Sequence, residues 1–287
     1  MRNLTEENMT EAVLKTFAAA KNERFKEIMT SLVNHLHTFI REVEPTEEEW
    51  LAGIQFLTAT GQLCDDTRQE FILLSDTLGV TALKDSINNR KPAGATPATV
   101  LGPFYREGAE EMPHLSNIAG DTPGEPAIVS GRVTTPEGEP IAGALLDIWQ
   151  ASADGFYDVQ DPNQPDMNLR GKIRTDAAGH YAFRTIKPSF YPIPSDGPVG
   201  KMLLAMGRHP YRPAHIHFII TAPGFEGVTT HIFVEGDPYL DSDAVFGVKD
   251  PLIVDFVRHD SGEEARKYGV TAPFHTVEYN FGLKPLD

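Results

Sequence analysis

The chain has 287 residues and a formal net charge of −16, with 41 acidic and 25 basic side chains. This length is enough for one large domain or two small ones whose core needs no disulfide or metal. The negative charge repels nucleic-acid phosphates and anionic lipids, so the composition argues against either partner. The single cysteine, Cys64, cannot form an intrachain disulfide, and the first residues lack the pattern of a secretory signal, which predicts a reduced, cytoplasmic setting. No run approaches the roughly 18 consecutive apolar residues of a membrane span.

Residues 5 to about 90 carry a helical pattern. From Phe25 to Val43 the apolar residues recur every three or four positions, at Phe25, Ile28, Met29, Leu32, Leu36, Phe39, Ile40 and Val43. This stripe predicts an amphipathic helix that faces a core or a partner. Thr46 and Glu49 have the spacing of a capping box, and Gly79 is a helix stop. Three or four helices are therefore expected in this part.

The pattern changes at 90–97, where proline, glycine and small residues replace the helical period. We place a domain boundary there, between residues 1–95 and 96–287. Beyond it, short apolar alternations separated by turns occur at 128–133, 145–149, 181–184, 215–220 and 231–234. Their spacing predicts an all-β second half, an antiparallel sandwich or barrel, in an α+β chain. The irregular stretches 158–170 and 188–198 are the loops in which a site is expected.

His215 and His217 lie one residue apart on a predicted strand, so both side chains project from the same face and could hold one metal ion. Two ordinary histidines at a core edge are an equally open interpretation. Zinc needs further cysteine, histidine or carboxylate ligands, and no H-E-x-x-H motif is present. Tyr157 and Tyr191 lie in the irregular loops; tyrosines of this kind usually only pack, but ferric iron can ionise a phenol and bind it.

Several motifs together resemble the intradiol ring-cleavage dioxygenases. They are Leu101-Gly102-Pro103-Phe104-Tyr105, the strands at 130–133 and 147–150, Asp154-Gly155-Phe156-Tyr157, Tyr191-Pro192-Ile193-Pro194 and Arg212-Pro213-Ala214-His215-Ile216-His217. The resemblance runs through most of the chain. It implies an N-terminal helical dimerisation segment, a homodimer joined by these helices, and a C-terminal catalytic β-sandwich. Family members can also hold a phospholipid in an apolar tunnel between the subunits.

The resemblance further implies a non-haem Fe(3+) ion held by Tyr157, Tyr191, His215 and His217. A catechol-type diol would chelate the ion and displace the Tyr191 phenolate, which accepts a proton, before dioxygen is inserted between the two hydroxyl-bearing carbons. Arg212 would stabilise carbanion character on the ring, as a fixed charge does in a preorganised site. An arginine in a surface ion pair is the alternative for this residue. His231 would act beside the metal ligands, or be a histidine that only orients them.

Three features resemble the hydroxyquinol-cleaving branch of this family: His231, the run Asp241–Asp250, and the acidic Asp76 after Leu73. The third hydroxyl of 1,2,4-trihydroxybenzene would satisfy a buried Asp76, although Asp76 could equally flank a helix end. The resemblance implies a ring pocket lined by Leu73, Asp76, Val100, Leu101, Gly102, Pro103, Phe104, Ile193, Pro194 and Val245.

The predicted reaction is intradiol cleavage of hydroxyquinol to 3-hydroxy-cis,cis-muconate or maleylacetate, in the catabolism of aromatic compounds. Catechol and chlorocatechol are the alternative substrates. The strands at 130–133 and 180–183 also resemble prealbumin-like modules that bind without catalysis. A zinc or copper enzyme built on His215 and His217 is a third interpretation, which lacks further ligands in the sequence.

Overall fold

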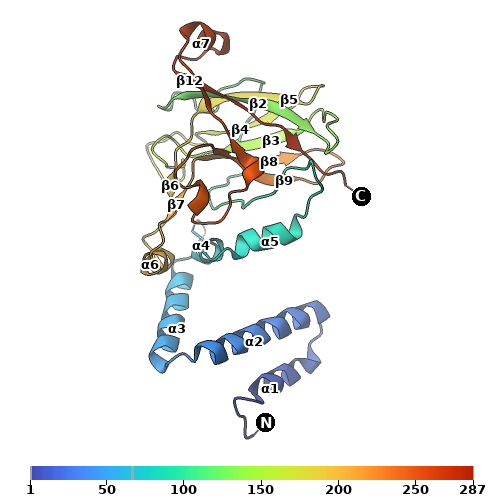
Figure 1. The fold of residues 1–287 in the computed structure, drawn as a ribbon, viewed down its shortest axis with the longest axis vertical. Coiled ribbons are helices and arrows are strands. Elements are labelled where there is room, and N and C mark those ends of the chain that lie inside the picture. The colour runs from blue at the N-terminus through green and yellow to red at the C-terminus, as the bar shows by residue number, and fades with distance from the viewer. Residues whose placement is uncertain (1, 66–67, 287) are drawn as a thin grey trace. The chain divides into compact units, whose positions relative to one another are not determined.

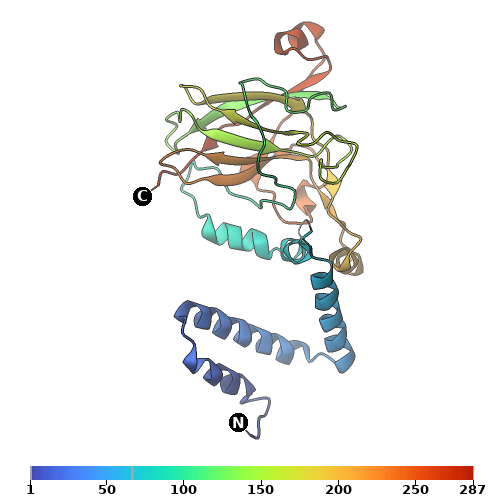
Figure 2. The same ribbon diagram turned by 180° about the vertical axis from the view of Figure 1, so that it is seen from behind.

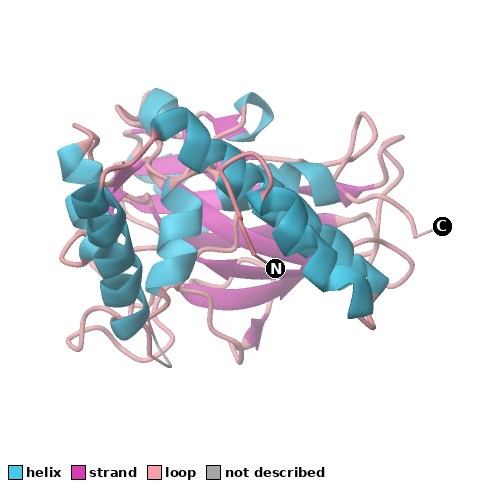
Figure 3. Cartoon of the chain, turned by 90° about the horizontal axis from the view of Figure 1, so that it is seen from below, coloured by secondary structure: helices cyan, strands magenta, loops and turns pink. Residues whose placement is uncertain are grey.

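The computed structural model describes residues 2–65 and 68–286 (Figures 1 and 2). The chain divides into two compact units, Met1–Ala59 and Thr60–Asp287. All the strands of the described residues belong to the second unit, and they are magenta in Figure 3. Among the described residues no helix is both long and apolar enough to cross a membrane.

The described residues form α-helices and strands in the following order. The helices are α1 (Met9–Lys15), α2 (Glu23–Val43), α3 (Glu47–Gln62), α4 (Glu70–Thr77), α5 (Val80–Asn88), α6 (Pro198–Ala205) and α7 (Gly262–Tyr268), with 3₁₀ helices at Thr16–Ala19, Leu240–Ser242 and Asp250–Leu252. The strands are β1 (Glu111–Met112), β2 (Pro126–Thr134), β3 (Leu145–Trp149), β4 (Arg170–Arg174), β5 (His180–Ile186), β6 (Tyr191–Pro192), β7 (Tyr211–Arg212), β8 (His215–Thr221), β9 (Val228–Val234), β10 (Ile253–Val254), β11 (Val257–His259), β12 (Phe274–Glu278) and β13 (Phe281–Gly282).

The first unit is helical, as predicted. Helix α2 begins where the Asn22 side chain accepts a hydrogen bond from the Phe25 amide, and α3 begins at the predicted capping box, in which Glu49 and Thr46 bond each other's backbone amides. No residue of α2 is buried. Apart from the half-buried Met29, its apolar stripe is exposed in the isolated chain, from 45% at Ile40 to 59% at Phe25. An apolar stripe of this length is typical of an interaction surface.

Between residues 60 and 95 the structure adds α4 and α5, so the helices before residue 90 number five among the described residues, more than the predicted three or four. Gly79 separates α4 from α5 with a φ of 73°, a left-handed conformation that suits glycine. Helix α4 belongs to the second unit, because Leu73 packs with Val199 and Leu203 of α6. The domain boundary between residues 95 and 96 stays a prediction.

The second unit is the predicted β-sandwich, with mixed rather than purely antiparallel pairing. One sheet has the strand order β1-β4-β3-β8-β9-β10; in the other, the order is β11-β12-β2-β13 and β5 also pairs with β2. The centre of the first sheet, β4-β3-β8-β9, is antiparallel, as are the pairs β2-β5 and β11-β12, whereas β1 pairs in parallel with β4, β10 with β9, and β12 and β13 with β2. The parallel strands reach their partners through long connections, which hairpins do not provide.

The core lies between the two sheets. Ile216, Phe218 and Ile220 of β8 face it and are fully buried, and Phe218 packs edge-on against Phe183 of the other sheet. The opposite face of β8 carries the two predicted metal ligands, because side chains alternate along a strand. The second half is not all-β: α6 begins at Pro198, in the stretch predicted as a loop, since proline is well tolerated in the first turn of a helix.

Candidate metal centre and ring pocket

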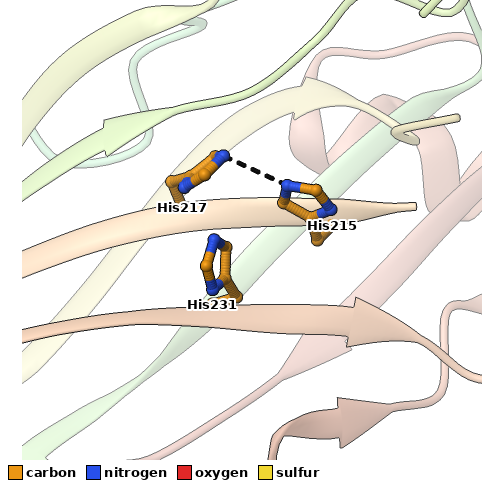
Figure 4. Close-up of side chains that lie close together, drawn as sticks. All are labelled: His215, His217 and His231. Atoms are coloured by element: carbon orange, nitrogen blue, oxygen red, sulfur yellow. Dashed lines mark hydrogen bonds between the residues drawn. The ribbon is translucent and has the colours of Figure 1, made fainter. Parts of the chain in front are cut away.

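Two neighbouring strands place three histidines on the outer face of one sheet. His215 and His217 belong to β8, and His231 on β9 is directly opposite His217 in the antiparallel register (Figure 4). All three imidazoles are buried, with 2% exposure or less. On the other side of β8, Trp149 of β3 pairs with His217, and its indole stacks on the imidazole with 4.6 Å between ring centroids.

Two loops bring the predicted tyrosines to this face. Tyr157 follows β3, and its neighbour Asp158 is held by ion pairs with Arg170 and Arg106. Tyr191 lies on β6, whose pairing with β7 puts Tyr191 opposite Arg212. Gly155 permits the two loops to approach, since a Cβ there would lie 3.0 Å from the Tyr191 Cβ, and its φ is +81°.

The four predicted ligand atoms converge. The Tyr157 hydroxyl lies 2.9 Å from His217 Nε2 and 3.2 Å from the Tyr191 hydroxyl. His215 Nε2 lies 3.1 Å from His217 Nε2 and 3.5 Å from the Tyr191 hydroxyl. Ligands about 2.1 Å from a common metal ion are about 3.0–3.4 Å apart, so the spacing of these four atoms fits one ion.

The protonation of the cluster also suits a metal ion. Burial lowers the pKa values of His215 and His217 well below the usual 6.5, and the charge of Arg212 acts in the same direction on both, so the imidazoles are neutral. His215 Nδ1 lies 2.6 Å from the Pro213 carbonyl oxygen, which can only accept, so Nδ1 carries the proton and Nε2 presents its lone pair to the cluster. Burial raises the pKa of the Tyr157 phenol well above 10, and only a strongly Lewis-acidic cation would ionise it at neutral pH.

His231 adjoins the cluster in a different way. Its Nδ1 is hydrogen-bonded to the Thr99 hydroxyl, and its Nε2 has no hydrogen-bond partner among the described residues. The facing nitrogens of His215, His217 and His231 all lie within 4.8 Å of one another, a looser grouping than the four atoms above. We therefore assign His231 to the surroundings of the ligand cluster, where its ring packs against both ligand imidazoles.

Arg212 is buried beside this cluster and is not a surface arginine. Its Nη1 lies 3.2 Å from His215 Nε2, and its Nε and Nη2 donate to the two carboxylate oxygens of Asp243 at 3.1 and 3.3 Å. Burial acts to lower the arginine pKa, but the charges of Asp243 and of the two tyrosines outweigh it and raise the pKa, so the guanidinium stays charged.

A cavity of about 350 Å³ adjoins the cluster, lined by Asp76, Val100, Leu101 and Gly102 among others. Gly102 connects the cavity with the metal centre, because a Cβ there would lie 3.3 Å from His217 Cε1. Asp76 is buried; its Oδ1 has no hydrogen-bond partner among the described residues. Burial raises the pKa of this carboxyl group, whereas a hydrogen bond from Thr81 and the charge of Arg212 lower it.

The other predicted pocket residues are placed in three ways. Four of them pack in one apolar cluster: Leu73, Val100, Ile193 and Val245. Phe104 stacks on Tyr157 at 4.6 Å between centroids, and Leu101 lines the cavity with 43% of its surface exposed. Pro103 is exposed and Pro194 is half-buried, and both are linked to the site only as sequence neighbours of Phe104 and Ile193.

Sequence reasoning missed the residues that support the site. These are Trp149, which stacks on His217; Thr99, which bonds His231; the Asp158–Arg170 ion pair behind Tyr157; and Asp243, the partner of Arg212. Trp149 could have been found, because it ends a predicted strand of the same sheet. The others lie 12 to 132 positions from their partners, and no pattern in the sequence indicates the pairing.

Comparison with known proteins agrees with this geometry. A family model described as the catechol dioxygenase N terminus matches residues 22–96, and one described as a dioxygenase matches residues 100–285. The chain is 51% identical to hydroxyquinol 1,2-dioxygenase of a Rhizobium species, over 97% of this chain and 95% of that protein. It is 54% identical to 6-chlorohydroxyquinol 1,2-dioxygenase of Cupriavidus pinatubonensis, over 99% of both chains.

A solved structure shares the whole fold. Hydroxyquinol 1,2-dioxygenase from Pseudomonas putida superposes with a TM-score of 0.92 at 50% identity, covering 98% of this chain and 99% of that one. The family models together match most of the chain, and the relatives match it at about half identity over nearly their full length. The predicted relationship is confirmed: this chain belongs to the intradiol ring-cleavage dioxygenases.

Proposed function

We propose that this chain cleaves hydroxyquinol between its two adjacent hydroxyl-bearing carbons with dioxygen, giving 3-hydroxy-cis,cis-muconate or its tautomer maleylacetate. The observation that carries the proposal is the convergence of two phenol oxygens and two imidazole nitrogens within 2.9–3.5 Å of their neighbours, beside a buried arginine. The chain's family uses non-haem iron, and these four atoms are the ligands that we assign to an Fe(3+) ion.

The chemistry divides between the ion and the protein. A ferric ion at this cluster supplies the Lewis acidity that favours the ionised forms of the tyrosines and of the bound diol. Tyr191 would be one of the residues that hold the ion, and its Oη would take up one phenolic proton of the substrate; this hydroxyl lies 3.5 Å from His215 Nε2, the longest spacing of the set. Arg212, with its charge held in a buried site, stabilises the negative charge that the ring gains when both hydroxyls ionise.

The choice of ring rests on the cavity beside the cluster. Asp76 Oδ1 is a buried acceptor without a partner among the described residues, and such an atom costs free energy unless a ligand donates to it. The third hydroxyl of hydroxyquinol is a donor of this kind, and catechol lacks it. The relatives with about 50% identity that carry the name hydroxyquinol 1,2-dioxygenase support the same substrate.

A chlorinated hydroxyquinol is a second candidate substrate. The relative from Cupriavidus pinatubonensis, 54% identical, is named for 6-chlorohydroxyquinol. Leu101 lines the cavity with an exposed aliphatic side chain in place of an aromatic ring, which leaves room for a ring substituent. We expect activity on both rings, whereas catechol and chlorocatechols, which have no third hydroxyl, are poorer substrates.

We also propose a homodimer joined through the first unit. The apolar stripe of α2 is long and exposed, and a second copy of the same surface would cover it. Sedimentation equilibrium should show a dimer for the wild type and a monomer for Leu36→Glu, which places a charge in mid-stripe. A monomeric wild type contradicts the proposal. A phospholipid at this interface and a cytoplasmic setting stay predictions.

The test of the reaction is a substrate panel with purified, iron-loaded protein. Oxygen uptake and product absorbance should show one dioxygen consumed per hydroxyquinol, with kcat/KM at least about tenfold above that for catechol, the difference expected from one satisfied buried acceptor. The iron-loaded protein should be wine red, and the colour should shift when diol is added without oxygen. Iron-loaded protein that is colourless, or that leaves every diol intact, contradicts the proposal.

A further inference from the structure

The carboxylate of Asp243, beside Arg212, accepts four hydrogen bonds. Each of its carboxylate oxygens accepts one hydrogen bond from the guanidinium and one from the backbone of its own loop. Oδ1 accepts from Arg212 Nε at 3.1 Å and from the Val245 amide at 3.3 Å, and Oδ2 accepts from Arg212 Nη2 at 3.3 Å and from the Gly247 amide at 2.9 Å. The side chains of Arg212 and Asp243 are 3% and 2% exposed, so water does not compete for these bonds.

The consequence for Arg212 is a fixed orientation. Asp243 engages Nε and Nη2, which leaves Nη1 as the edge that faces His215 Nε2 at 3.2 Å. An arginine side chain has several rotatable bonds, and a planar carboxylate that meets it at two points selects one of their combinations. The guanidinium is therefore directed at His215 by a residue 31 positions away in the sequence.

Asp243 also fixes the position of Val245, which we place in the wall of the ring pocket. Val245 packs with Leu73, Val100 and Ile193, and its amide is tied to Asp243 Oδ1. Behind the loop lies a second hollow of about 470 Å³, lined in part by Arg208, Asp241 and Phe246. The Arg208 guanidinium also holds this loop by donating to the Ala244 carbonyl, whereas the bond to Asp243 is the one that ties the Val245 amide itself to the partner of Arg212.

We propose that Asp243 is a positioning residue that holds the Arg212 guanidinium and the Val245 wall in one rigid unit, so that the charge and the ring pocket keep their places relative to each other. This inference rests on the proposed function, because it assigns Arg212 and Val245 to the reaction and to the diol pocket. Gly247 belongs to the unit: a Cβ there would lie 2.9 Å from Arg212 Nη2 and 3.1 Å from Asp243 Oδ2.

Asp243→Asn tests the unit with the smallest change. An amide offers one acceptor oxygen where the carboxylate offers two. Its NH₂ group must face either Arg212 Nη2 and the Gly247 amide or Arg212 Nε and the Val245 amide, donor against donor in both orientations. We expect kcat for hydroxyquinol to fall by about 10- to 100-fold, the loss typical of a misplaced charge, while iron content stays at the wild-type level. Asp241→Asn is the matched control, because it removes the same charge from an exposed position on the same loop, and we expect wild-type kcat.

Amide hydrogen exchange gives a readout that does not depend on turnover. In metal-free protein, a peptide spanning residues 240–250 should exchange faster in Asp243→Asn than in the wild type, and Asp241→Asn should match the wild type. Asp243→Asn with kcat within about twofold of the wild type, or with unchanged exchange in this peptide, overturns the inference. A wild-type protein that does not cleave hydroxyquinol would instead overturn the proposed function, whatever the exchange shows.

Gly247→Ala provides a second variant that keeps both charges. Its methyl group would enter the space of Arg212 Nη2 and displace the guanidinium. We expect kcat to fall as in Asp243→Asn, with iron content unchanged. Wild-type turnover in Gly247→Ala would show that the orientation of the guanidinium does not matter, and would overturn the inference even where Asp243→Asn does not fold.

Discussion

The metal centre and the ring pocket lie side by side but differ in how completely their polar atoms are satisfied. In the cluster of Tyr157, Tyr191, His215 and His217, each ligand atom has a neighbour within 3.5 Å. In the pocket, Asp76 Oδ1 is buried without a partner among the described residues, next to a cavity of about 350 Å³. In the proposed function, the four clustered atoms would hold the iron ion, and the unpartnered oxygen of Asp76 would accept a hydrogen bond from the substrate.

Tyr157→Phe should have the largest effect, because it removes one proposed ligand atom and keeps the aromatic ring. The ring can stay stacked on Phe104, but the oxygen 2.9 Å from His217 Nε2 is lost. We expect turnover to fall by about 1,000-fold or more, as when a member of a catalytic group is deleted, and the visible absorbance of the iron-loaded protein to change. Stopped-flow absorbance and metal analysis measure both effects.

Tyr181→Phe is the matched control for this change. Tyr181 is equally buried, but it lies on β5 in the other sheet and donates its hydroxyl to the Tyr279 carbonyl. Its loss should reduce the free energy of unfolding by about 1–3 kcal/mol, because the carbonyl loses its donor. Turnover per bound iron should not change. If both variants lose turnover equally, the distinction between the cluster and the rest of the sandwich is wrong.

Arg212→Ala should have the next largest effect, and it separates charge from metal binding. Turnover should fall by about 100- to 1,000-fold with iron still bound, because a preorganised charge beside the reacting ring is lost. The free energy of unfolding should also fall, by about 3–5 kcal/mol, since Asp243 is left as a buried charge without its partner.

The double variant Arg212→Ala/Asp243→Ala distinguishes these two losses. Removing the Asp243 carboxylate, which has lost its partner, should restore part of the free energy of unfolding measured in urea or by heating. Turnover should stay low. Turnover that recovers together with stability would show that Arg212 acts only through the fold.

Asp76→Ala should have the smallest effect, and one that depends on the substrate. We expect kcat/KM for hydroxyquinol to fall by about tenfold, the value of one buried hydrogen bond to a charged group, and kcat/KM for catechol to change less than about threefold. Asp85→Asn is the control, because Asp85 lines the same cavity but is already paired with Lys84. A parallel fall on both diols would place Asp76 in the fold of α4 and remove it from substrate choice.

Sequence reasoning predicted the local geometry correctly where the signal is local. The alternation of β8 put His215 and His217 on one face, and the capping box at Thr46 and the stop at Gly79 were read correctly. The tyrosines were reached through the resemblance of several motifs to one family, because spacing alone does not bring Tyr157 to His217, 60 positions away. Helix α6 was missed, since it is short and begins at Pro198, the last residue of a proline-rich stretch that is typical of loops.

By itself, the sequence determined the kind of elements, the face of each strand that carries polar side chains, and, through its motifs, the family. Those properties depend on side-chain periodicity and on residues close together in the chain. The tertiary structure decided which groups meet: the four ligand atoms, the pairing of Arg212 with Asp243, and the unpartnered Asp76 beside Gly102. These side-chain contacts depend on how the sheets and loops pack, because the distance between two side chains is set by the whole fold and not by their separation in the sequence.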